Sequence, residues 1–96
     1  MKNDYYSKDK LDELIPLAGI YQLFESDSGS INLVYIGKSQ NLRWRLIEHS
    51  RSKLLRFDYY NYEFCPKRML AQLEINRLSM HLEEFGHLPK YNKQLG

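Results

Sequence analysis

Residues 19–37 read GIYQLFESDSGSINLVYIG, and this stretch decides the predicted fold. Its first part, residues 19–25, is rich in β-branched and aromatic residues, which is typical of a β-strand. Residues 26–30 (SDSGS) are typical of a turn, and residues 31–36 (INLVYI) predict a second strand. Two strands joined by a short loop that contains glycine predict an antiparallel hairpin.

The residues that follow predict a helix, a strand and a longer helix. Residues 37–39 (GKS) are expected to end the second strand, after which Ser39 or Asn41 can cap a helix that reaches Ser50. Residues 57–64 (FDYYNYEF) are aromatic and predict a third strand. Pro66 suits the first turn of a long helix over residues 67–85, which Gly86 can end.

Residues 8–15, before the hairpin, predict a short helix with Ser7 as its possible N-cap and Pro16 as its end. The expected order is a possible helix followed by β-β-α-β-α. We predict a small α/β (α+β) domain, in which helices flank a three-stranded, mostly antiparallel sheet. Since 96 residues suffice for one domain, residues 1–96 are expected to form a single domain.

The composition is that of a soluble globular protein, with 43% apolar and 27% charged residues. No stretch approaches the roughly 18 continuous apolar residues of a membrane span. Residues 1–10 lack the apolar region of a secretory signal. Cys65 is the single cysteine and cannot form an internal disulfide, which fits a reducing compartment. We therefore expect a cytoplasmic protein without a membrane partner.

The positive charge is concentrated in the middle of the chain, although the net charge is only +2. Residues 37–68 hold eight basic and three acidic side chains, whereas residues 1–36 hold three basic and six acidic ones. Such a basic segment can contact phosphates. From charge alone, an ordinary solvated surface is the simpler interpretation.

Arg45 and His49 are four residues apart in the first predicted helix and therefore share a face. A guanidinium offers a planar set of donors to phosphate oxygens, and an imidazole exchanges protons near neutral pH. The pair is thus a candidate for chemistry at a phosphate. Two ordinary surface side chains would show the same spacing.

Glu74 lies on or beside the apolar stripe of the long helix. A buried carboxylate without a partner is costly, so we expect a cation or a metal ion next to it. An ion pair with Arg77, or with an arginine elsewhere, is one possibility. A lone carboxylate also suits an oxygen-preferring ion such as Mg²⁺. The stripe itself repeats at steps of three and four residues and consists of Leu70, Leu73, Leu78, Leu82 and Phe85.

Tyr21 and Tyr35 are expected near the same end of the hairpin. A tyrosine hydroxyl can hold or deprotonate a water, but its usual pKa of about 10 requires help from a cation. Lys38, just after the second strand, can provide it. Strand tyrosines are also common as core residues or cross-strand partners.

Taken in order, these features resemble the GIY-YIG nuclease superfamily. Gly19-Ile20-Tyr21 and Tyr35-Ile36-Gly37 resemble the two tripeptides that give the superfamily its name. Residues 38–49 resemble its passage from strand to first helix. Glu74 matches its metal-binding glutamate, and Pro89-x-x-Asn92 resembles the segment that closes its domain. The resemblance covers residues 17–92 and leaves residues 1–16 as an N-terminal extension.

The resemblance implies an endonuclease that hydrolyses phosphodiester bonds in duplex or branched DNA with one divalent ion, Mg²⁺ or Mn²⁺. It implies that Glu74 is the metal ligand. It also implies a set of catalytic or supporting side chains: Tyr21, Tyr35, Arg45, His49, Asn92 and, matching only part of the superfamily, Lys38.

Many members carry a further DNA-binding domain or insertions, and we do not expect room for either within these 96 residues. DNA affinity would then come from a homodimer, from a protein partner, or from basic side chains: Lys38, Arg43, Arg51, Lys53, Arg56, Lys67 and Arg68. One alternative is a module that binds nucleic acid without cutting it, and another is a catalytic subunit that is inactive without a partner. A third is a structural or protein-interaction domain that resembles the superfamily by chance. The sequence leaves the biological role, the specificity, the oligomeric state and the metal open.

Overall fold

The structure is a computed structural model that describes residues 4–93. The predicted hairpin is present and consists of β2 (Gly19–Asp27) and β3 (Ser30–Ser39). Ser28 and Gly29 connect the strands with φ angles of 49° and 85°. Positive φ at both residues is what a two-residue turn of type I′ requires, because its twist matches that of the strands.

The prediction that residues 37–39 end the second strand was wrong. The ladder continues to the pairs Tyr21↔Gly37 and Gly19↔Ser39, so β3 includes the whole GKS segment. A glycine usually weakens a strand, but it also marks a place where other groups approach the backbone closely. Gly37 is such a place, and its neighbours belong to the candidate site described below.

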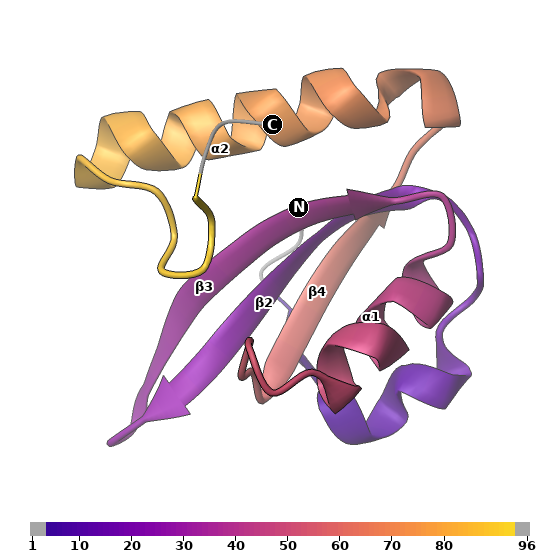
Figure 1. Cartoon of the computed structure of the whole chain (residues 1–96), viewed down its shortest axis with the longest axis horizontal. Helices are drawn as coiled ribbons and strands as arrows, with labels where there is room; N and C mark the ends of the chain where they lie inside the picture. Colours follow the sequence, from indigo (N-terminus) through magenta and orange to yellow (C-terminus); the bar gives the residue numbers. More distant parts are fainter. Residues whose placement is uncertain (1–3, 94–96) are drawn as a thin grey trace.

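The sheet has four antiparallel strands rather than the three that the sequence predicts. Their order is β1-β4-β2-β3, with β1 at Tyr6–Ser7 and β4 at Tyr59–Phe64. β1 is only two residues long, too short for an alternating pattern to reveal it. β2 is therefore a central strand, and β3 is an edge strand (Figure 1).

Two helical elements, η1 and α1, precede β4 in the sequence. The short helix η1 (Lys8–Glu13) is a 3₁₀ helix, and the Ser7 side chain accepts a hydrogen bond from the Asp9 amide, as an N-cap does. Helix α1 (Leu42–Arg51) begins after Asn41, whose side chain accepts from the Trp44 amide at 3.0 Å. Both predicted N-caps, Ser7 and Asn41, are confirmed.

The long C-terminal helix is divided into a 3₁₀ turn, η2 (Lys67–Met69), and α2 (Leu70–Phe85). Pro66 lies just before η2 with extended backbone angles rather than inside the first helical turn. Gly86 ends α2 with φ of 77°, the left-handed conformation typical of a glycine after a helix. None of the helices in residues 4–93 is long and apolar enough to cross a membrane.

The two helices pack against different sets of sheet residues (Figure 1). Alternate residues of a strand point to opposite faces of the sheet, so neighbours such as Ile20 and Tyr21 belong to different cores. Ile20 packs with residues of α2, whereas Tyr21 belongs to the cluster built around α1 and η1. The first cluster contains Ile20, Ile36, Leu70 and Leu78, and the second contains Leu11, Leu14, Tyr21, Leu23, Val34, Leu42, Leu46, Phe57 and Tyr60.

The segment after α2 covers the exposed edge of β3. Asn92 Nδ2 donates to the Ile36 carbonyl, and Asn92 Oδ1 accepts from the Ile36 amide, both at 2.9 Å. The Tyr91 amide donates to the Val34 carbonyl. An edge strand otherwise presents unpaired backbone groups, so this segment provides partners for three of them: the Ile36 amide, the Ile36 carbonyl and the Val34 carbonyl.

Replacing Asn92 by Ala should therefore destabilise the protein, by about 1–3 kcal/mol for the partners left unpaired at Ile36. Urea denaturation followed by circular dichroism measures this change. Asn32→Ala, on an exposed position of the same strand, is the control and should change stability little. Equal stability of the two variants would contradict a structural role for Asn92.

Candidate active site

Tyr21 is the centre of the candidate site. Its ring is almost completely buried, with 1% of its surface exposed, on the central strand β2. Its hydroxyl lies 2.7 Å from His49 Nε2, and its ring centroid lies 6.0 Å from that of Tyr35 on β3. The His49 ring lies 5.3 Å from the Tyr35 ring. The structure thus brings together Tyr21, Tyr35 and His49 from three elements.

Two glycines make room for this arrangement. A Cβ atom on Gly37 would collide with the phenol end of Tyr21 and would lie 2.8 Å from Tyr35 Cε2. A Cβ atom on Gly19 would collide with the Glu63 carbonyl oxygen and would lie 2.7 Å from Leu42 Cδ1. Gly37 therefore allows both tyrosine rings to lie against β3, and Gly19 allows the start of β2 to approach β4 and α1 closely.

His49 is neutral at physiological pH. Its burial, and then the nearby charge of Arg45, lower its pKa from 6.5 to about 4. A neutral imidazole has one nitrogen that accepts a hydrogen bond. Burial, and then the neighbouring Tyr35, raise the pKa of Tyr21, so its hydroxyl keeps its proton. The two shifts are consistent with a Tyr21 hydroxyl that donates to His49 Nε2.

Arg45 lies one turn before His49 on α1, as its spacing predicts. Its guanidinium is close enough to the Tyr21 hydroxyl to lower the pKa of Tyr21, although burial has the larger, opposite effect. It also forms an ion pair with Glu48, at 3.2 Å between Nη1 and Oε1. The side chain remains 43% exposed, so it can reach an incoming ligand. Glu48 was missed from the sequence, although its i,i+3 spacing from Arg45 is a known signal.

Glu74 is buried on α2 and has a cationic partner, as expected. The partner is Lys38 of β3, whose Nζ donates to Glu74 Oε1 at 2.8 Å. The alternative of a pair with Arg77 is not what the structure has, because Arg77 forms its ion pair with Glu63 of β4. Glu74 is also close enough to Tyr21 to raise its pKa, as the last and smallest of several causes. Glu74 and Lys38 therefore border the site at Tyr21.

The Asn92 side chain contacts the backbone of β3 and does not point freely into the site. Both polar atoms of its amide are hydrogen-bonded to Ile36, which lies between Tyr35 and Gly37. Asn92 thus supports the strand that carries Tyr35. Its role in chemistry stays a prediction.

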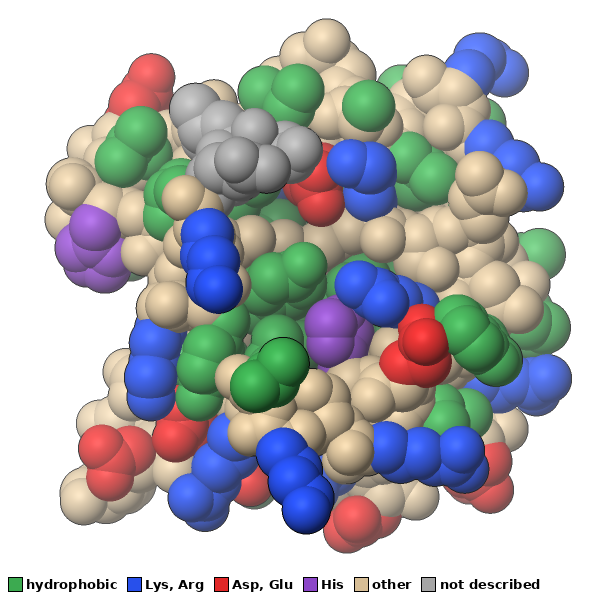
Figure 2. Space-filling view, viewed as in Figure 1, with side chains coloured by type: hydrophobic (Ala, Val, Ile, Leu, Met, Phe, Trp, Pro, Cys, Tyr) green, Lys and Arg blue, Asp and Glu red, His purple; other side chains and the backbone are tan. Residues whose placement is uncertain are grey.

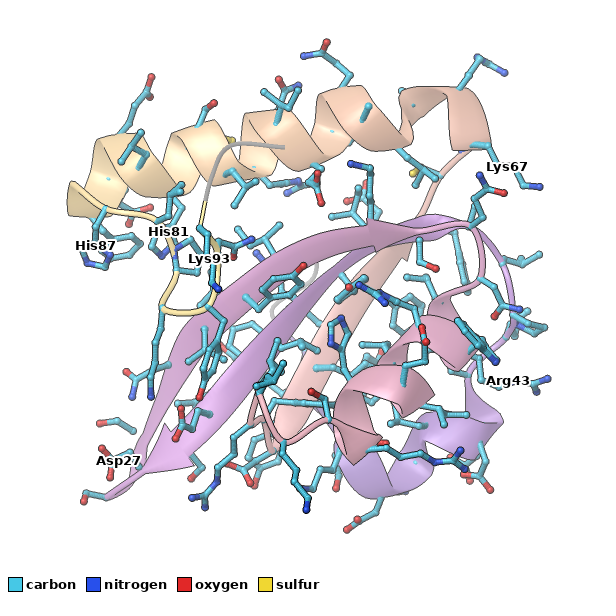
Figure 3. All side chains as sticks on the ribbon, viewed as in Figure 1. Asp27, Arg43, Lys67, His81, His87 and Lys93 are labelled. Atoms are coloured by element: carbon cyan, nitrogen blue, oxygen red, sulfur yellow. The ribbon has the colours of Figure 1, made fainter. Side chains whose placement is uncertain are left out.

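The predicted nucleic-acid-binding residues do not form one cluster. Figure 3 labels Arg43 on the outer side of α1 and Lys67 at the start of the long helix, and both point away from the middle of the molecule. Arg51 lies at the end of α1, Lys53 and Arg56 follow it in the loop, and Arg68 is in η2. In Figure 2, the same face has a hollow with hydrophobic and histidine side chains, and lysines and arginines lie around it.

Three crystal structures are similar to this chain over most of its length. All three are of the GIY-YIG N-terminal endonuclease domain of UvrC from Thermotoga maritima, with 20–21% sequence identity and a TM-score of 0.64. The matches cover 91% of this chain and 94% of the other. This chain has the GIY-YIG endonuclease fold. The fold that the two tripeptides predict is thereby confirmed.

The three structures are point mutants of that UvrC domain, two with tyrosine replaced by phenylalanine and one with asparagine replaced by alanine. Each is bound to the domain's catalytic divalent cation. No protein-family model and no curated protein matches this chain. At 21% identity the similarity shows a shared GIY-YIG fold, and the activity has to be argued from the side chains.

The lowered pKa of His49 predicts a pH-dependent stability. The folded protein resists protonation of His49 until about pH 4, whereas an unfolded histidine takes up a proton near pH 6.5. Stability from this group is therefore present above pH 6.5 and is lost as the pH falls toward 4. Thermal unfolding at pH 7.5 and at pH 5 should show a larger loss of Tm for the wild-type protein than for His49→Gln. Parallel losses would contradict a buried neutral histidine.

Proposed function

We propose that the chain is a metal-dependent endonuclease that hydrolyses phosphodiester bonds in DNA. The observation that carries this proposal is the buried hydrogen bond between Tyr21 and the neutral imidazole of His49, with Arg45 beside it. The shared fold supports it, since the similar structures are endonuclease domains that hold a catalytic divalent cation. We further propose that residues 1–96 are one domain that acts in the cytoplasm.

The Tyr21–His49 pair supplies a path for a proton. Because the pKa of Tyr21 is raised, its hydroxyl does not ionise by itself at neutral pH. It can accept a proton from an attacking water while it passes its own proton to His49 Nε2. The resulting hydroxide attacks the phosphorus, the bond between phosphorus and the leaving oxygen on the opposite side breaks, and the leaving oxygen takes up a proton from solvent. Tyr35, in contact with both rings, helps to hold the water in place.

Arg45 stabilises the charge that develops during this attack. Its guanidinium can donate two hydrogen bonds to the non-bridging oxygens of the phosphate. Its partly exposed side chain reaches both the Tyr21 hydroxyl and the solvent side of the site. Arg45 and the Tyr21–His49 pair are therefore close enough to act on the same phosphate.

The side chains of the site fit a single divalent ion. Glu74 offers one buried carboxylate, and no group of three or more histidine, cysteine or acidic side chains within residues 4–93 could enclose a metal. Mg²⁺ commonly binds in this way, to one or two carboxylates with water and phosphate as the other ligands. When bound, the ion would act as a Lewis acid toward the leaving oxygen.

A cleavage assay tests the proposal. Supercoiled plasmid and a branched oligonucleotide are incubated with the protein in Mg²⁺, Mn²⁺ or EDTA. We expect cleavage only with a divalent ion, and Arg45→Ala and Glu74→Gln should each lower the rate about 10²- to 10³-fold, as loss of a transition-state contact typically does. Circular dichroism should show that both variants remain folded.

Glu83→Gln is the matched control, because it removes one carboxylate from an exposed position of the same helix. It should cut at the wild-type rate. Full activity of Glu74→Gln would contradict the proposal. Metal-independent DNA binding by folded protein without any cleavage would favour a binding module, and cleavage only after addition of a partner would favour a partner-dependent subunit.

The Lys38–Glu74 ion pair predicts competition between Lys38 and the metal. The ammonium occupies Glu74 Oε1, so a divalent ion has to displace it or accept a positive charge nearby. Lys38→Met should therefore bind Mn²⁺ several-fold more tightly in isothermal titration calorimetry. The metal-free variant should also unfold at a lower temperature, because Glu74 is left buried without a counter-ion.

Lys90→Met is the control for this measurement, since it removes the same charge from an ion pair with Glu25. Its Mn²⁺ affinity should match that of the wild type, and Glu74→Gln should abolish binding. Unchanged or weaker Mn²⁺ binding by Lys38→Met would show that Lys38 does not compete with the ion.

A further inference from the structure

A cavity of about 330 Å³ lies at the C-terminal end of α1 and is bordered by His49, the hydrogen-bond partner of Tyr21. We call it the α1 pocket. Its charged lining is entirely positive, since Lys8, Lys53 and Arg56 border it and no aspartate or glutamate does. Its other lining residues are His49, Ser50, Ser52, Leu55 and Phe57.

The three cations of the α1 pocket are not neutralised within residues 4–93. The ion pairs in this part of the chain involve Lys38, Arg45, Arg77 and Lys90, and none includes Lys8, Lys53 or Arg56. The Ser52 hydroxyl accepts from the Leu54 amide at 3.1 Å, which leaves its own proton able to donate to a ligand. The pocket therefore presents both charge and a hydrogen-bond donor to an anion.

The helix dipole opposes an anion here, but it is the weaker effect. The C-terminal end of a helix carries about −0.5 elementary charge, whereas the pocket holds three full positive charges. Lys8 comes from the start of η1, and the other two cations come from the loop after α1. The net field of the pocket thus favours a group of negative charge, such as a phosphate.

His49 joins the α1 pocket to the candidate active site. The same residue borders the pocket and is hydrogen-bonded to Tyr21 through its imidazole. Phosphates recur along one strand at about 3.4 Å of rise. A strand whose scissile phosphate lies at Tyr21 and Arg45 therefore has neighbouring phosphates close enough to reach a pocket that adjoins His49. Figure 2 shows lysine and arginine side chains below the hollow on this face.

We propose that the α1 pocket binds a backbone phosphate of the nucleic-acid strand that is being cut, adjacent to the scissile phosphate. The proposal rests on the nuclease function proposed above. It selects Lys53 and Arg56 from the dispersed basic residues and adds Lys8, which the sequence analysis did not identify. Leu54, 89% exposed beside these cations, gives the strand an apolar contact that a free phosphate ion would not use.

The test is oligonucleotide binding in EDTA, which separates binding from cleavage. Fluorescence anisotropy with a labelled DNA oligonucleotide gives the dissociation constant at several salt concentrations. Lys53→Gln and Arg56→Gln should each weaken binding several-fold and lower the slope of log K against log salt by about one. Lys90→Gln, which removes the same charge outside the pocket, should leave both quantities unchanged.

The proposal would be overturned if Lys53→Gln and Arg56→Gln both had the same oligonucleotide affinity and the same salt slope as Lys90→Gln. Binding of free anions alone would also overturn it. In that case inorganic phosphate would shift the Ser52 and Lys53 amide signals in NMR spectra, while both variants would keep the wild-type affinity for the oligonucleotide. A wild-type protein that binds no oligonucleotide would contradict the proposed nuclease function itself. Binding that is insensitive to Lys53 and Arg56 would contradict only the α1 pocket.

Discussion

The close contact of Tyr21 with Gly37 is the constraint on which the rest of the site depends. A tyrosine ring on a central strand can lie across its ladder partner only if that partner has no Cβ atom. With Gly37 opposite, the ring is buried and its hydroxyl reaches His49 of α1. Burial then separates the protonation behaviour of the two groups, since it raises the pKa of Tyr21 and lowers that of His49. A packing requirement in the sheet thus creates the candidate proton-transfer pair.

The second half of the site is electrostatic. Glu74 is buried on α2, and a buried carboxylate requires a positive partner. Lys38 provides this partner from the edge strand β3, which also carries Tyr35 and Gly37. The edge strand is in turn stabilised by Asn92 through its two hydrogen bonds to Ile36. Helix α2, through Glu74, and the segment after it, through Asn92, therefore both contact β3. The proposed substrate position lies beside this strand.

Much of the fold was predictable because its signals are local. The turn at Ser28 and Gly29, the N-cap at Asn41 and the helix end at Gly86 each follow from the backbone preferences of a few adjacent residues. Two features were not. The strand β1 has only two residues and exists because Tyr6 and Ser7 pair with β4. The continuation of β3 through Gly37 depends on its ladder with β2, which outweighs the weak strand preference of glycine.

The sequence by itself determined which side chains were candidates and which of them share a helix face. Arg45 and His49 are neighbours because four residues make about one helical turn. Only the tertiary structure decided the partners: His49 with Tyr21, Lys38 with Glu74 and Asn92 with Ile36, at separations of 28, 36 and 56 residues. Local spacing offered Arg77 as one possible partner of Glu74, but Arg77 forms its ion pair with Glu63 of strand β4. Sequence periodicity specifies contacts within one element, whereas contacts between elements depend on how the sheet and helices pack.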